Sequence, residues 1–269
     1  TSDEERSSGM GKFGAANNLG TILGPVLVGS LIGMNVFEIS TPQFGLLTPL
    51  IVMSLIMTVA AIIVYVYLPD NHSTQPEQNK NPRIVLDLRL RYLMSIGIII
   101  FTAFALVQSI TAFYIQDRFG LDLDSTAQTT ALLLGTMALA AIVSQLTVVQ
   151  RYKGSALNLI KFSVPMFVLS VILIIFSPNF NLFYLGMALM GLGMGLASPG
   201  YTASASLNAD DQSQGAAVGL AMVAPGIGFA VGPFLSGILY SFSMNLPFLF
   251  ILPIYLILVL LLRKLELLN

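Results

Sequence analysis

The sequence contains no cysteine and no tryptophan, has a single histidine, and only 9% of its 269 residues are charged. Without cysteine, neither a disulfide framework nor a thiolate metal site is possible. His72 lies in a polar stretch with no Ser-His-Asp arrangement within reach, and a histidine pair for a metal is excluded. The basic residues are dispersed, which argues against a nucleic-acid partner. We therefore expect no enzymatic activity, no metal and no cofactor.

Long apolar segments dominate what is present, since 55% of the residues are hydrophobic. A soluble domain does not hide this much apolar surface behind so few charges. Crossing a bilayer as a helix takes about 20 mostly apolar residues. The sequence predicts an all-α membrane protein with eight spans, at residues 11–35, 46–68, 92–116, 128–150, 157–177, 182–204, 214–240 and 245–263.

The basic residues predict the orientation of these spans, because lysine and arginine are retained on the cytoplasmic side. If residue 1 is cytoplasmic, Arg118 is the only basic residue on the outer side. The inner side then holds Arg6, Lys12, Lys80, Arg83, Arg89, Arg91, Arg151, Lys153, Lys161, Arg263 and Lys264. Both termini and the polar linker at residues 69–91 are therefore expected in the cytoplasm.

Two distant segments repeat the same spacing of glycine and proline. A shift of 208 positions carries LGPVLVG, residues 23–29, onto residues 231–237, VGPFLSG, and places glycine on glycine and proline on proline. The two copies lie on the first and the seventh predicted spans, so equivalent spans are six apart. A six-helix unit repeated in the same orientation is one architecture of secondary transporters.

These residues also carry a family resemblance. The acidic opening TSDEER, the segment GTILGPVLVGS and residues 191–219, GLGMGLASPGYTASASLNADDQSQGAAVG, resemble the major facilitator superfamily. The resemblance implies a major facilitator fold of which this chain carries helices five to twelve. Residues 1–68 would be the last two helices of the N-terminal half, residues 69–91 the cytoplasmic inter-domain linker, and residues 92–269 the C-terminal half.

Within the superfamily, the glycine and proline motif is similar to the fifth-helix motif of drug:proton antiporters, although Val28 stands where that motif has glycine. Small residues let helices approach closely in lipid, and proline bends a helix. We expect a closely packed, kinked seam between the two halves. Its packing and gating positions are Gly20, Gly24, Pro25 and Gly29 in the first copy, and Gly228, Gly232, Pro233 and Gly237 in the second.

The solute is expected near the midplane between the halves, where the resemblance implies that the seventh and tenth helices line the cavity. Phe101, Phe104, Gln108 and Thr111 recur at helical spacing on the span at residues 92–116. A stripe of aromatic, amide and hydroxyl groups suits an amphipathic organic molecule. The alternative is that Gln108 only bonds a neighbouring helix, since polar groups join membrane helices.

The span at residues 182–204 carries two interlocking patterns. Gly186, Gly193 and Gly200 fall every seven residues and predict close packing, and a methionine stripe runs beside them. Methionine adapts to varied solute shapes, but such a stripe is more often ordinary packing. The stripe consists of Met187, Met190 and Met194 and continues to Tyr201.

The acidic residues all lie in loops, tails or helix ends, so the chain offers no proton relay of its own within the membrane. We hypothesise a proton-coupled (multi)drug efflux antiporter of a bacterial inner membrane, monomeric when full length, with a small hydrophobic or amphipathic molecule as substrate and protons as the coupling ion. Two alternatives stay open: an importer of a polar metabolite such as a sugar or an organic anion, and a non-transporting membrane sensor or assembly protein.

Overall fold

The structure is a computed structural model that describes residue 20 and residues 42–67, 88–206 and 214–267. These residues form helices and connecting loops without a strand. The helices are α2 (Pro42–Tyr67), α3 (Leu88–Phe119), α4 (Leu123–Thr147), α5 (Ala156–Phe176), α6 (Phe180–Ser206), α7 (Gln214–Phe242) and α8 (Leu246–Glu266), with a short 3-10 helix η1 (Val149–Arg151) after α4. The described residues thus contain seven helices long and apolar enough to cross a membrane.

The predicted spans from residue 46 onwards are confirmed, each as one helix that begins and ends within five residues of the predicted limits. The expected span at residues 11–35 lies outside the described residues except for Gly20. Local signals account for the helix ends between α3 and α4. Gly120 follows α3 with a positive φ of 62°, a conformation that glycine adopts without strain. The Asp122 carboxylate accepts a hydrogen bond of 2.7 Å from the Ser125 backbone and caps α4.

The Asp122 cap lies outside the spans and has an electrostatic effect on the carboxyl group. Hydrogen bonds from the side chain and the backbone of Ser125 stabilise the charged form and hold the pKa of Asp122 below its usual range. The cap therefore stays ionised at neutral pH.

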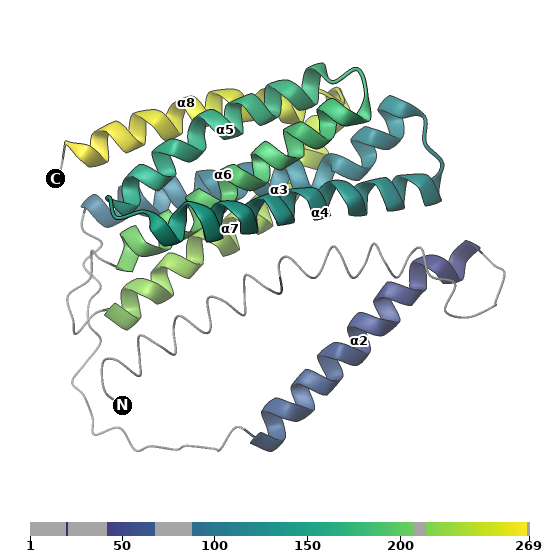
Figure 1. Cartoon of the computed structure of the whole chain (residues 1–269), viewed down its shortest axis with the longest axis horizontal. Helices are drawn as coiled ribbons and strands as arrows, with labels where there is room; N and C mark the ends of the chain where they lie inside the picture. The colour runs from purple at the N-terminus through teal and green to yellow at the C-terminus, as the bar shows by residue number, and fades with distance from the viewer. Residues whose placement is uncertain (1–19, 21–41, 68–87, 207–213, 268–269) are drawn as a thin grey trace.

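Helices α3 to α8 pack into one bundle (Figure 1). Helices α3 and α6 lie in the middle, with α5 and α8 on one side and α4 and α7 on the other. The main pairs are α5 with α6, α3 with α7 and α4 with α6, while α8 packs against α3 and α5. The core lies between these helices and includes Ile96, Leu106, Phe167, Phe183 and Phe248, each at most 1% exposed.

Five prolines lie in helix interiors: Pro165 in α5, Pro199 in α6, Pro225 and Pro233 in α7, and Pro253 in α8. A proline removes one backbone hydrogen bond, and a membrane helix tolerates this because neighbouring helices and hydroxyl side chains satisfy the freed carbonyl.

Candidate functional site

An aromatic cluster joins the three helices α3, α6 and α7. Phe101 of α3 lies 5.9 Å from Tyr201 of α6 and 6.2 Å from Phe229 of α7, measured between ring centroids. Phe104 of α3 meets the same Phe229 edge to face at 6.3 Å. Phe101 and Phe104 are each 6% exposed, whereas Phe229 is 44% exposed. The cluster, Phe101, Phe104, Tyr201 and Phe229, therefore reaches the surface of the bundle through Phe229.

Gln108 lies one turn beyond Phe104 on α3 and is half-buried. Within the described part of the chain, its amide has no hydrogen-bond partner. Thr111, one turn further, is fully buried, and its hydroxyl donates to the Val107 carbonyl of the same helix at 2.7 Å. Of the two polar groups in the predicted stripe, Gln108 is thus the one with accessible donors and acceptors.

The methionine stripe of α6 divides into two environments. Met187 and Met190 are 0% exposed and belong to the core of the bundle. Met194 is partly buried and packs against the core from its edge. In this conformation Met187 and Met190 contribute packing, and only Met194 keeps surface that a solute can reach.

A close contact between α3 and α7, here called the α3–α7 seam, is formed at Gly228 and Gly232. A Cβ added at Gly228 would lie 2.5 Å from the Phe101 Cβ, and one at Gly232 would lie 2.8 Å from both the Ala105 Cβ and the Thr102 carbonyl oxygen. The predicted contact between the two halves stays a prediction, while this seam lies between two helices of the described bundle. The seam is close because the small Ala105 side chain lets the α3 backbone approach the two glycines.

The other positions of the motif lie elsewhere. Gly237 is exposed, with no atom within 4 Å of an added Cβ, and Pro233 is exposed as well. Neither residue is closely packed among the described residues, so its role in a packed seam between the halves stays a prediction. In the first copy, an added Cβ at Gly20 meets no neighbour, and Gly24, Pro25 and Gly29 lie outside the described residues.

Glycines of α6 face two different helices. Gly186, Gly193 and Gly200, the predicted seven-residue series, all lie against α5, where added Cβ atoms would be 2.7–2.9 Å from the nearest atoms. The Ser170 hydroxyl of α5 donates to the Gly186 carbonyl at 2.7 Å across this contact. Gly191 and Gly195 lie against α4, where added Cβ atoms would overlap backbone carbonyl groups. The sequence analysis predicted the first face and missed the second.

A polar network connects helix ends on the side where Arg118 lies. The Arg118 guanidinium donates to the Ile175 and Ser177 carbonyls at the end of α5, at 2.8 and 2.7 Å, and also to the Tyr114 hydroxyl. Tyr114 in turn donates to the Asn245 side chain before α8 at 3.0 Å. The positive charge meets the partly negative carboxyl end of α5. The sequence showed Arg118 only as the lone outer basic residue, because two of its three partners are backbone carbonyls.

Six apolar helices that pack through glycine contacts, with polar groups gathered at their ends, define a multi-pass integral membrane protein. The family model of the Major Facilitator Superfamily matches residues 1–159 and, separately, residues 149–267. The two matches together span almost the whole chain, and the chain belongs to the major facilitator superfamily.

Two known proteins are similar to the chain. Multidrug resistance protein 1 of Bacillus subtilis (strain 168) is 23% identical over 254 residues, which cover 93% of this chain and 62% of that protein. The crystal structure of the human organic anion transporter MFSD10 (TETRAN) matches with a TM-score of 0.60 at 16% identity, over 82% of this chain and 59% of that one. The chain thus spans about three fifths of the length of each, and the structural likeness shows the fold.

Proposed function

We propose that the complete protein is a secondary transporter that exports a small hydrophobic or amphipathic solute in exchange for protons. The observation that carries this proposal is the aromatic cluster beside the unpaired Gln108. Aromatic faces supply apolar contact area, and one amide supplies a donor and an acceptor that fix orientation, the usual composition of a small-molecule site. Membership of the superfamily and the name of the Bacillus relative support the proposal.

Charge further favours a solute without a strong negative charge. The basic residues of α3 to α8 lie near helix ends, and Arg118 is already engaged by carbonyl groups and Tyr114. A buried anion needs a cationic partner within the membrane, and the aromatic cluster has none among its members. An importer of organic anions would therefore need its counter-charge from another part of the protein.

Proton coupling needs an ionisable group within the membrane. In the described helices the acidic residues are Asp117, Asp124 and Glu266, each within a few residues of a helix end. Asp117 accepts a hydrogen bond from Tyr240 at 2.5 Å at the edge of α3 and α7. We infer that the coupling carboxylate belongs to a part of the protein other than residues 88–206 and 214–267.

The first test replaces Gln108 by alanine in the complete protein and measures transport of several amphipathic solutes. If Gln108 orients the solute, the relative preference among solutes that can accept or donate a hydrogen bond should change about two- to ten-fold, the value of one hydrogen bond. Gln145→Ala, at another half-buried glutamine on α4, is the matched control and should leave preference unchanged. A uniform loss of folded Gln108→Ala protein with unchanged preference would favour the helix-joining role and reject the site.

The second test concerns orientation, for which the support is the placement of eleven basic residues on one side. The absence of cysteine allows single cysteines to be introduced without background. Ser73→Cys in the linker and Asp124→Cys at the start of α4 are treated in intact cells with a thiol reagent that does not cross membranes. We expect labelling at position 124 and none at position 73, and the reverse pattern would invert the proposed topology.

A further inference from the structure

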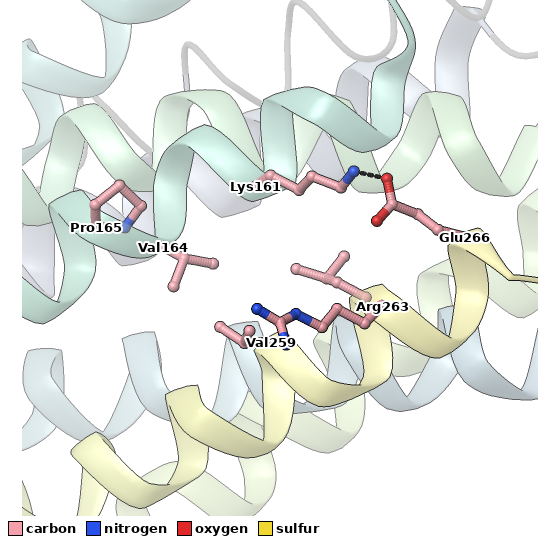
Figure 2. A pocket seen from close by; sticks show the side chains of 7 residues that line it. Lys161, Val164, Pro165, Val259, Arg263 and Glu266 are labelled. Carbon is pink, nitrogen blue, oxygen red and sulfur yellow. Dashed lines mark ion pairs between the residues drawn. The ribbon is translucent and has the colours of Figure 1, made fainter.

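We propose that a groove between α5 and α8 binds one anionic phospholipid, with its phosphate at Arg263 and an acyl chain along the groove. The groove has a volume of about 330 Å³ and is lined by seven residues from these two helices. They are Lys161, Val164 and Pro165 of α5, and Val259, Leu262, Arg263 and Glu266 of α8 (Figure 2). This proposal does not depend on transport, because α5 and α8 lie on the side of the bundle opposite α4 and α7.

The lining changes from polar to apolar along the groove. The Lys161–Glu266 pair lies at the end nearest the end of α8, the Arg263 side chain extends from there toward Val259, and Val164 and Pro165 line the groove beyond (Figure 2). A phospholipid has the same order of chemistry, with a charged headgroup followed by hydrocarbon. Free phosphate would use the polar end and leave the apolar walls without a partner.

The charges at the polar end leave one cation available. Lys161 forms an ion pair with Glu266, and both side chains are partly exposed. Arg263 has no carboxylate partner among the residues that the structure describes, so the three charged groups of the lining sum to +1. A guanidinium presents two parallel N–H donors that match phosphate oxygens. The Arg263 guanidinium lies beside Val259 (Figure 2), at the boundary between the polar and apolar parts.

The surface around the groove is apolar and exposed, as expected of a surface that faces lipid. Phe162 and Leu169 of α5 are 50% and 47% exposed, and Leu256 and Leu260 of α8 are 63% and 52% exposed. A lipid tail in the groove would thus continue the bilayer hydrocarbon expected against these exposed rims. Basic pockets between membrane helices near a cytoplasmic surface bind anionic headgroups in general, and Arg263 lies on the side predicted to be cytoplasmic.

The test uses the whole chain in a neutral detergent, where no charged membrane surface contributes. Phosphatidylglycerol or phosphatidylcholine is added, and bound lipid is counted by native mass spectrometry. We expect one phosphatidylglycerol per chain, retained under conditions that remove phosphatidylcholine. Arg263→Gln should weaken this binding about ten-fold or more, as expected for the loss of a charge-assisted contact. Equal retention of the two lipids would overturn the proposal.

Lys264→Gln provides the matched control, because it removes one positive charge at the next residue, which does not line the groove. Binding should change less than about two-fold, the proportion expected when no specific contact is lost. A loss equal to that of Arg263→Gln would show general attraction to the basic helix end and would overturn the site. Melting temperatures in detergent without lipid show whether the variants remain folded.

Two further experiments distinguish a lipid from other possible occupants of the groove. Val259→Phe fills the apolar part of the groove and keeps every charge, so it should also weaken phosphatidylglycerol binding. Unchanged binding would contradict the placement of an acyl chain in the groove. Inorganic phosphate at millimolar concentration should not displace the lipid. If phosphate displaced the lipid to the same extent from the wild type and from Val259→Phe, the groove would be a site for free phosphate and the lipid proposal would be overturned.

Discussion

Helices α2 and α6 are both long enough to span a membrane, and the more apolar of the two is the less buried. Helix α2 has the higher hydropathy, yet none of residues 50–67 is buried. Helix α6 is less apolar, and half of its most apolar window is buried. In water the more apolar helix would be expected inside. In a bilayer, lipid is as apolar as leucine, so hydropathy alone does not decide which helix is central.

The two helices also differ in glycine content. Between residues 50 and 67 of α2 there is no glycine, and the exposed side chains are large, with Leu50 66% and Tyr65 89% exposed. The glycines of α6 are Gly186, Gly191, Gly193, Gly195 and Gly200, and each contacts a neighbouring helix. Close backbone approach gains van der Waals contact between helices, which is the main source of packing energy in lipid.

The largest expected effect is that of Gly191→Leu in α6. A side chain there would meet the Met137 carbonyl of α4, which is backbone and has no rotamer to change. The cost should be about 3 kcal/mol or more, at the upper end for overpacking. The yield and melting temperature of the purified protein measure it. Ala61→Leu in α2, at an exposed position, is the control, and equal losses for both variants would remove the distinction between the two helices.

An intermediate effect is expected for Gly232→Leu in the α3–α7 seam. An added side chain would contact Ala105 and the Thr102 carbonyl, which should cost about 1–3 kcal/mol. Gly237→Leu makes the same change on the same helix, where an added Cβ meets no neighbour. The melting temperature should fall for Gly232→Leu and change little for Gly237→Leu. If Gly237→Leu were the more damaging, the seam would lie elsewhere, at a surface that another part of the protein covers.

The smallest effect is expected for Arg118→Gln, which changes a contact at a helix end. The side chain is half-buried, so the loss of its bonds to the Ile175 and Ser177 carbonyls should cost only about 1 kcal/mol. Arg151→Gln, at an exposed arginine in η1, removes the same charge without these bonds. A thermal melt of both variants compares them, and the capping role is rejected if Arg151→Gln is equally destabilised.

The spans could be predicted from the sequence because length and apolar content are local properties. The seven-residue glycine series of α6 was likewise readable, since a helix places such residues on one face. The helix that each glycine face contacts could not be predicted, and Gly191 and Gly195 show why. Their contact depends on where α4 lies, which no local pattern of α6 states. The α3–α7 seam could not be located for the same reason. The repeated spacing of glycine and proline suggested a contact between the two halves, but did not state which helix Gly228 and Gly232 contact.

The candidate site was predicted in part. The spacing of Phe101, Phe104 and Gln108 indicated one face of α3, and the structure adds Phe229 of α7 as the exposed member of the cluster. Phe229 lies next to Gly228 on α7, and its contact with α3 depends on how the two helices pack, which no local pattern states. Met187 and Met190 could not be assigned to the core from spacing, because a stripe that faces a cavity and one that faces a neighbouring helix have the same period.

The two glycine faces of α6 also determine which motions this helix can make. Rotation by one residue position, about 100°, would bring Leu192 to the place against α4 that Gly191 holds. Sliding along the axis would move Gly193 away from the Phe167 ring and press a larger neighbour against α5. Both movements drive side chains into atoms of α4 or α5, which favours movement of α4, α5 and α6 together. A displacement within the bundle would then be taken up at contacts outside that group of three helices.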